Sequence, residues 1–444
     1  MKRIAIVRLS ALGDVIVSAS VLGGLRLFSA NALSPKEDLQ IDWFVDERFS
    51  GVLEDSPCID CLHSLPFKKW LKSPIGIYKI WRYMRSCGKY DAVIDMQGLI
   101  KSALVGKFLR SKKFMGFSAR GCREGIASIF YTHRVDIAYD TNILVRNFLV
   151  VFGAFGMDLH KILKSIGLRL DKDYLEDLER IDSALKSTKS DSEESIEGLE
   201  RVIMNLGAFK RITDLRGEGF GINVGKLIDF DDKFLTHKKH LAQTYFKKYC
   251  SKGLKARQEF ELESIKDFGK KSSVDSCPKE VLESKKFLFV LEASIEEKIY
   301  PIDKYCTLAR MLQKHYGNIT IYVIWNEAEG RANEIISLLK SRQIRAIKLP
   351  KLDFNNIKFV LKNMDIVIGG DTGITHLAWA IWQPCSIALL GNNQNSSGKN
   401  MQQTRLKRVL LGNPFVISQS GEFEIASIAP DAIFECVKAH LDTD

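Results

Sequence analysis

The stretch MDIVIGGDTGITHLAWAIWQP, residues 364–384, decides the fold class of this 444-residue chain. Its apolar beginning predicts a buried strand, and Gly369 and Gly370 permit a sharp turn and a close approach of backbone to a ligand. The residues after Asp371 predict a helix that ends before Pro384. Free N–H groups and the positive dipole end at such a helix start favour a bound diphosphate. An ordinary strand-turn-helix of an α/β sheet is the alternative interpretation.

Strand and helix patterns alternate on both sides of this stretch. Apolar runs predict strands at 4–9, 41–45, 92–95, 287–291, 319–324, 344–349, 366–368 and 386–390. Helical periodicity marks 15–28, 75–87, 99–110, 141–155, 301–315 and 431–441. This alternation predicts largely parallel sheets covered on both faces. We therefore expect α/β domains at 1–170 and 286–428, with a cleft between their strand ends, and a C-terminal helix at 429–444.

The α/β rhythm stops between residues 171 and 285. The polar, low-complexity stretch 186–194 cannot bury enough surface to order itself, whereas neighbouring pieces are more apolar. We expect an interdomain insertion that is partly helical and partly disordered. Its basic segment 237–248 is either a contact for an anionic membrane surface or a solvated charged helix.

The composition indicates a globular protein with anionic partners. The formal net charge is +11, which fits nucleic acid, phosphorylated metabolites or a membrane surface, but no nucleic-acid recognition motif accompanies it. No apolar run is long enough for a transmembrane helix, and Arg8 and Asp14 interrupt any signal-peptide core. The nine scattered cysteines show no second pair at zinc-ribbon spacing beside Cys58 and Cys61. A cytoplasmic protein with reduced thiols, able to lie against a membrane, is the prediction.

Charged residues just after predicted strands are the candidate site residues. Asp14 is either a general base or a helix N-cap. Lys298 is placed to reach a diphosphate as a point charge, and Glu327 or Glu329 to accept hydrogen bonds from ribose hydroxyls. The alternative for each of these residues, taken singly, is an ordinary surface position. Basic loops at 67–72 and 117–124 either bind carboxylates and phosphates or are simply solvated.

Seven segments, taken in order, resemble the lipopolysaccharide heptosyltransferase I family of ADP-heptose glycosyltransferases. They are RLSALGDV, KKWLKSPI, YDAVIDMQGLIKSALV, ARGCREGIASIFY, EEKIYP, WNEAEGRA and DTGITHLA. The resemblance covers roughly 1–165 and 285–415 and omits the middle. It implies the GT-B fold, with two Rossmann-like doubly wound parallel-sheet domains facing a cleft. The loop 391–395 departs from the Gly-Pro-Thr type that the family often carries there.

The resemblance also implies roles for residues at matching positions. It makes Asp14 the catalytic base and the N-terminal domain the acceptor side, with Lys68, Arg120 and Arg123. The C-terminal domain becomes the donor side, with Ser294, Lys298, Glu327, Glu329, Asp371, Thr372, Gly373 and His376.

The implied reaction is inverting transfer of L-glycero-D-manno-heptose from ADP-heptose, the donor substrate, to a Kdo residue of Kdo-lipid A. No cluster with metal-ligand spacing is visible in the sequence, so we expect chemistry without an obligatory metal or cofactor, and we expect no nucleic-acid partner. The expected location is a peripheral place on the cytoplasmic face of the inner membrane. Alternatives are a heptosyltransferase II, another nucleotide-sugar transferase, or a non-catalytic lipopolysaccharide-binding or scaffold paralogue.

Overall fold

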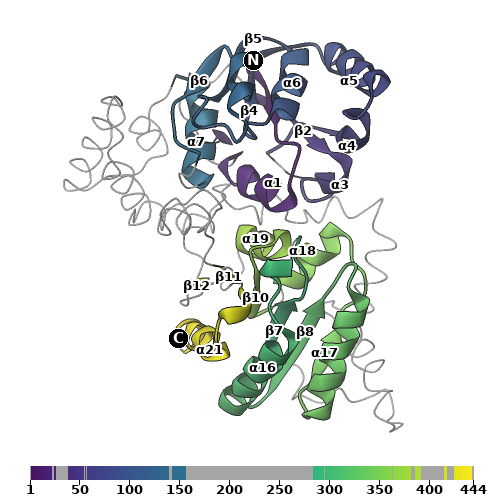
Figure 1. Ribbon diagram of the computed structural model, residues 1–444, viewed down its shortest axis with the longest axis vertical. Helices are drawn as coiled ribbons and strands as arrows, with labels where there is room; N and C mark the ends of the chain where they lie inside the picture. The colour runs from purple at the N-terminus through teal and green to yellow at the C-terminus, as the bar shows by residue number, and fades with distance from the viewer. Residues whose placement is uncertain are drawn as a thin grey trace, which may run out of the picture. The chain divides into compact units, whose positions relative to one another are not determined.

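The computed structural model describes residues 2–22, 25–26, 39–54, 56, 58–139, 143–156, 284–294, 296–362, 364–381, 386–391, 415–417 and 425–442. These residues belong to two compact units, and each unit contains its own six-stranded sheet (Figure 1). The expected insertion at 171–285 lies outside the described residues except for its last two positions. Residues 392–395, in the loop that differs from the family pattern, also lie outside the described residues.

The N-terminal unit is a doubly wound parallel sheet. Its strands are β1 (Lys2–Val7), β2 (Leu39–Asp46), β3 (Cys61–Leu65), β4 (Lys89–Asp95), β5 (Arg110–Phe117) and β6 (His133–Val135). Its helices are α1 (Leu12–Ala19), α3 (Glu47–Ser50), α4 (Phe67–Trp70), α5 (Pro74–Ser86), α6 (Ile100–Phe108), the 3₁₀ helix η1 (Gly125–Phe130) and α7 (Ile143–Gly153). The strand order β3-β2-β1-β4-β5-β6 reverses between β1 and β4, where such sheets place their ligands.

The C-terminal unit repeats this topology. Its strands are β7 (Lys285–Val290), β8 (Ile319–Ile324), β9 (Ala346–Lys348), β10 (Ile366–Gly370), β11 (Ser386–Leu390) and β12 (Phe415–Ile417). Its helices are η4 (Glu296–Lys298), α16 (Ile302–Tyr316), α17 (Glu329–Ser341), α18 (Phe354–Lys362), α19 (Gly373–Ala380), η5 (Ile425–Ser427) and α21 (Pro430–Leu441). The order β12-β11-β10-β7-β8-β9 places the reversal between β7 and β10.

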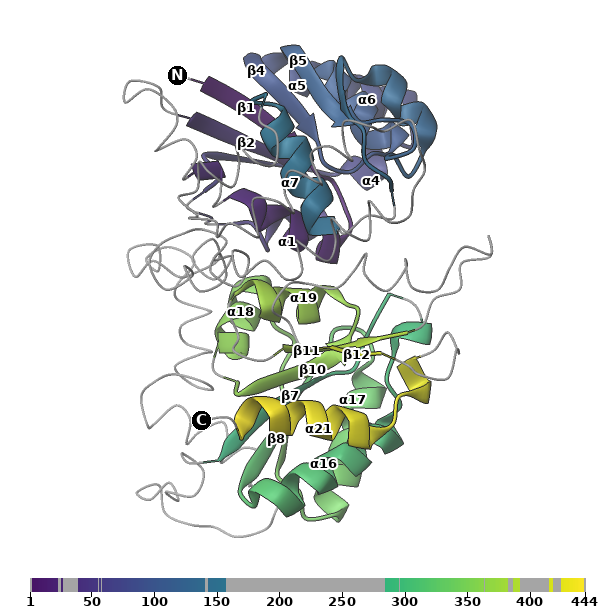
Figure 2. The same ribbon diagram turned by 90° about the vertical axis from the view of Figure 1, so that its left-hand side faces the viewer.

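The local signals explain most element bounds. Ser73 accepts a hydrogen bond from the Gly76 amide at 3.1 Å, and Pro74 begins α5 because a first-turn proline needs no N–H partner. Helix α16 ends at Gly317, whose φ of +71° favours glycine. Strands β7, β8, β10 and β11 are almost wholly buried, as central parallel strands are. Figure 2 shows α21 lying beside α16, which it contacts.

The prediction of two parallel α/β sheets is confirmed, and several bounds differ. The first helix begins at Leu12 rather than at Val15. The sequence patterns missed β3, β5, β6, β12 and α18. All four of these strands lie at or next to a sheet edge. β6 and β12 are only three residues long, and β5 begins with charged residues. Such strands lack the continuous apolar run that marks a central strand.

Candidate functional site

Asp14 lies at the switch point of the N-terminal sheet, in the first turn of α1. Its Oδ2 is 2.8 Å from Nη2 of Arg8, which follows β1. The Arg8 side chain is 7% exposed and the Asp14 side chain 43% exposed. The alternative of a helix N-cap does not hold, because Ala11 occupies that position. A buried cation therefore anchors a carboxylate that solvent can reach.

A second buried arginine, Arg146 on α7, lies in the electrostatic environment of Asp14. Burial, and to a smaller extent the Arg8 charge, lower the pKa of its guanidinium to about 10, although Tyr139 and Asp14 oppose the shift. Its Nη2 donates to the Gly121 carbonyl at 2.5 Å, and the guanidinium lies 4.6 Å from the Phe117 ring centre. The sequence reasoning missed both arginines. Two features of the sequence could have identified them. Arg8 lies at the end of a predicted strand, and Arg146 lies within a largely apolar predicted helix.

The loop after β4 is fixed by Asp95, which is fully buried. Its carboxylate accepts hydrogen bonds from the Gln97 amide (2.8 Å), the Ser102 hydroxyl (2.8 Å) and the Tyr131 hydroxyl (2.8 Å). Burial raises the pKa of the Asp95 carboxyl, and these hydrogen bonds oppose the rise. Gln97 in turn accepts from the Leu9 amide at 2.8 Å. The loops after β1 and β4 are thus joined, which sets the backbone around Asp14.

The three expected acceptor residues differ in their surroundings. Lys68 on α4 and Arg123 are exposed. Arg120 forms a bidentate ion pair with Asp136, with Nε–Oδ1 and Nη2–Oδ2 distances of 2.7 and 2.8 Å. Lys68 and Arg123 therefore present their charges to solvent, whereas the Arg120 guanidinium is already bound to a carboxylate.

Lys298, Asp371 and His376 form one network at the switch point of the C-terminal sheet. Lys298 Nζ donates to Asp371 Oδ2 at 2.5 Å, and His376 Nε2 donates to Asp371 Oδ1 at 2.8 Å. The Asp371 side chain is 8% exposed and the Lys298 side chain 20%. Nδ1 of His376 is buried and has no hydrogen-bond partner in the described part of the chain. A buried carboxylate thus holds a more accessible ammonium group.

The glycines after β10 allow this arrangement. A Cβ atom on Gly370 would lie 2.3 Å from the Lys298 carbonyl oxygen, and one on Gly369 would lie 2.6 Å from Val290 Cβ. Both distances are shorter than van der Waals contact, so any side chain would displace the Lys298 loop or β7. The sequence predicted a close approach of this backbone to a ligand, and the neighbours that the structure shows are the Lys298 loop and β7.

Thr372 and Gly373 form the start of α19 beside this network. Thr372 is the N-cap in extended conformation, without a side-chain cap, and Gly373 is the first helical residue. The first amides of a helix lack intrahelical acceptors and carry its positive dipole end. Ser294 is exposed in the loop between β7 and η4.

The two candidate ribose acids are not equivalent. Glu329 Oε1 lies 2.9 Å from Lys348 Nζ, in an ion pair on the surface. Glu327 is exposed in the loop after β8. That loop is held by Glu292, whose Oε1 accepts from the amides of Asn326 (2.7 Å) and Ala328 (2.8 Å). Glu292 is a positioning residue that the sequence reasoning missed.

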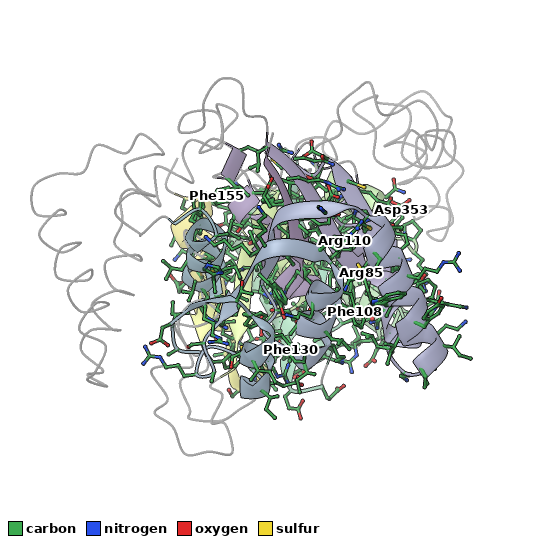
Figure 3. All side chains as sticks on the ribbon, turned by 90° about the horizontal axis from the view of Figure 1, so that it is seen from above. Arg85, Phe108, Arg110, Phe130, Phe155 and Asp353 are labelled. Atoms are coloured by element: carbon green, nitrogen blue, oxygen red, sulfur yellow. The ribbon has the colours of Figure 1, made fainter. Side chains whose placement is uncertain are left out.

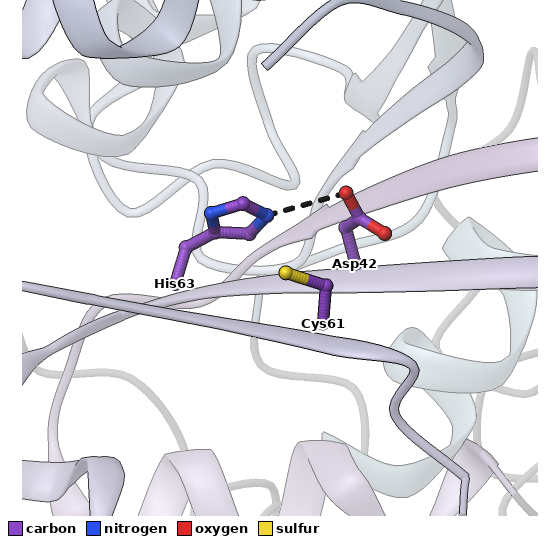
Figure 4. Close-up of side chains that lie close together, drawn as sticks. All are labelled: Asp42, Cys61 and His63. Carbon is purple, nitrogen blue, oxygen red and sulfur yellow. Dashed lines mark hydrogen bonds and ion pairs between the residues drawn. The ribbon is translucent and has the colours of Figure 1, made fainter. Parts of the chain in front are cut away.

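One group of potential metal ligands lies away from both switch points. Asp42, Cys61 and His63 offer ligand atoms within 4.8 Å of one another (Figure 4). The Asp42 carboxylate, however, accepts from Arg3 Nη2 at 2.6 Å and from the Tyr90 hydroxyl at 2.7 Å. Burial and the Asp42 charge raise the pKa of the Cys61 thiol. A guanidinium beside the carboxylate and a protonated thiol fit a structural hydrogen-bond network better than a metal site.

Two doubly wound parallel-sheet domains are the architecture of GT-B glycosyltransferases. In this chain, each domain has charged groups at its switch point. E. coli heptosyltransferase WaaC, solved with ADP-2-deoxy-2-fluoro heptose, shares this fold with a TM-score of 0.59 and 16% identity over 98% of this chain and 99% of that chain. E. coli ADP-heptose lps heptosyltransferase II superposes with a TM-score of 0.53 and 14% identity over 99% and 98% of the two chains.

The chain belongs to glycosyltransferase family 9 (heptosyltransferase), whose model matches residues 77–182 and 233–407. It is therefore a glycosyltransferase. A relative from Campylobacter coli, named lipopolysaccharide heptosyltransferase 1, is 27% identical over 443 residues, which is 98% of each chain. Family similarity thus extends further into the middle of the chain than the sequence motifs indicated.

Proposed function

We propose that this enzyme transfers L-glycero-D-manno-heptose from ADP-heptose to a Kdo residue of Kdo-lipid A, with inversion at the anomeric carbon. The family membership and the name of the full-length Campylobacter coli relative support a lipopolysaccharide heptosyltransferase. The WaaC structure solved with a fluorinated ADP-heptose supports the choice of donor. The proposed place of action is the cytoplasmic face of the inner membrane.

The Lys298–Asp371 pair beside the start of α19 is the observation that carries this proposal. An ammonium group has three N–H donors, and the contact with Asp371 uses one of them. The other two and the first amides of α19 are available for the donor diphosphate. As the sugar leaves, ADP gains negative charge, and fixed donors at this point lower the barrier. Ser294, Thr372 and His376 would complete the diphosphate and sugar contacts.

The ion pairs also discriminate between the two candidate ribose acids. We assign the ribose contact to Glu327, because Glu329 is already paired with Lys348. The loop that carries Glu327 is held by Glu292 through backbone amides, so contacts within the protein position it.

Asp14 is the proposed general base for the attacking Kdo hydroxyl. Proton transfer requires an oxygen–oxygen distance of about 2.6–3.2 Å in the reacting complex. A single base and a single displacement give inversion through an oxocarbenium-like state. Lys68 and Arg123 would meet the Kdo carboxylates and lipid A phosphates. Arg120 can join them only if it leaves Asp136, so we assign it to holding its loop.

The testing experiment measures ADP release by the full chain with ADP-heptose and Kdo-lipid A. We expect turnover only when both are present, with loss of rate when ADP-heptose is replaced by ADP-glucose or the acceptor already carries heptose. We expect EDTA to leave the rate unchanged, because Lys298 and helix amides supply the positive charge. Activity only on a heptosylated acceptor would indicate a heptosyltransferase II. Lipid binding without turnover would indicate a scaffold paralogue.

A further inference from the structure

Large hydrophobic side chains are exposed on one part of the N-terminal unit. Among the described residues, the exposed large hydrophobics are Ile75, Tyr78, Trp81, Ile100, Ile126 and Ile129. The first three lie on α5, the next begins α6, and the last two lie on η1. Ile75, Ile126 and Ile129 are 71%, 65% and 68% exposed, which is unusual for isoleucine.

These three elements are neighbours. Helix α6 contacts both α5 and η1, and the Ile100 amide donates to Glu124 at 2.7 Å, just before η1 begins. Figure 3 labels a residue near the end of each of these elements: Arg85 on α5, Phe108 on α6 and Phe130 on η1. We call the exposed side chains of these elements the α5–η1 face. A clustered apolar surface of this kind marks an interaction site.

The net positive charge of the chain comes from the part of the sequence that contains these elements. Residues 66–130 contain 14 of the 65 Lys and Arg residues but 3 of the 54 Asp and Glu residues, so this stretch alone accounts for the net charge of +11. Within α5, the cations Lys79, Arg82 and Arg85 are exposed, and the helix has no carboxylate. The partner of this surface must therefore be both anionic and able to accept apolar side chains.

Helix α5 combines the two properties on a single exposed side. Gly76, Ile80 and Met84 are buried at intervals of four residues, so they face the unit's interior. Opposite them, Tyr78 and Trp81 stack with ring centres 5.8 Å apart, and the Arg85 guanidinium lies 6.0 Å from the Trp81 ring. Aromatic rings interleaved with long cations are typical of segments that lie in a membrane interface, where rings sit at headgroup level and cations meet lipid phosphates.

We propose that the α5–η1 face docks on a bilayer containing anionic phospholipids. A bilayer accepts apolar tips and phosphate contacts over one continuous surface, whereas a nucleic acid offers no place for three exposed isoleucines. The inference rests on the proposed function, because it presents the acceptor side to a lipid-linked substrate. Lys68, a proposed acceptor contact, is on α4, which contacts α5. None of the helices in the described ranges is long and apolar enough to cross a membrane.

The test is cosedimentation of the full chain with vesicles of phosphatidylethanolamine and phosphatidylglycerol, without Kdo-lipid A or ADP-heptose. Binding is expected to weaken with salt and to be lost on phosphatidylcholine vesicles. Ile126→Ser with Ile129→Ser, and separately Lys79→Glu with Arg82→Glu, should each weaken binding by at least about tenfold. The matched control, Arg310→Glu with Lys314→Glu on exposed positions of α16, makes the same charge change and should bind as wild type.

Circular dichroism melting checks that each variant folds, and all altered side chains are exposed. Equal losses in the α5 and α16 charge variants would overturn the inference, because net charge alone would then explain binding. Binding of an oligonucleotide but not of vesicles would overturn it as well. Transfer to a water-soluble Kdo acceptor by a chain that fails to bind vesicles would overturn this inference and leave the proposed function intact.

Discussion

The two switch points carry the same pair of charges in opposite arrangements. In the N-terminal unit the cation is buried and the carboxylate is accessible, with side-chain exposures of 7% for Arg8 and 43% for Asp14. In the C-terminal unit the carboxylate is buried and the cation is more accessible, with 8% for Asp371 and 20% for Lys298. Arg8 and Asp14 both follow β1, whereas Lys298 follows β7 and Asp371 follows β10, and the two sheets have the same strand order.

In the proposed function, this reversal gives one topology two tasks. The buried member of each pair holds its partner, and the accessible member is the group proposed to meet the substrate. An accessible carboxylate can take a proton from a hydroxyl, whereas an accessible ammonium group can hold a diphosphate. The comparison therefore predicts two different effects. Removal of Asp14 should lower the rate of transfer, and removal of Lys298 should weaken donor binding.

Removal of the Asp14 carboxylate should have the largest effect. Asp14→Asn keeps the size of the side chain and removes the base, so we expect kcat to fall by about 10²- to 10⁴-fold. Single-turnover measurement of heptose transfer checks the rate. Calorimetric titration of ADP should give the wild-type dissociation constant, because the proposed donor contacts lie in the other unit. Turnover close to that of wild type would remove Asp14 from the mechanism.

Removal of the Lys298 ammonium group should act on donor binding. Lys298→Met keeps the length of the side chain, and loss of a charge-assisted bond of about 1.5–3 kcal/mol should raise the ADP dissociation constant by about 10- to 100-fold. Calorimetry with ADP measures this, with Asp14→Asn as the variant that should not change. If Lys298→Met bound ADP as wild type does, the proposed contrast between the two pairs would fail.

The smallest effect concerns the two acids after β8. Glu327→Gln should weaken ADP binding about threefold to tenfold, because a ribose hydroxyl loses an ionised acceptor. Glu329→Gln removes the ion pair with Lys348 and should leave ADP affinity unchanged, since exposed pairs contribute little. Competition binding with a fluorescent ADP analogue resolves changes of this size. The reverse pattern would assign the ribose contact to Glu329.

The central strands and the glycine turn could be predicted from the sequence, because their signals are local. Continuous apolar runs fixed β8 and β11 at the observed bounds, and Gly369 and Gly370 marked a crowded stretch of backbone whose neighbours are the Lys298 loop and β7. The edge strands β3 and β6 escaped prediction, because a short strand gains its order from pairing with a neighbour far along the chain.

The sequence by itself determined which residue types follow which strands, and hence the candidates Asp14, Lys298 and Asp371. Only the tertiary structure decided their partners. Arg8, Asp95 and Glu292 act through contacts whose geometry depends on strand order, and Arg120 is bound to Asp136 in a way that no spacing rule predicts. The physical reason is that burial and ion pairing depend on groups distant in sequence, whereas turns and periodicity depend on neighbours.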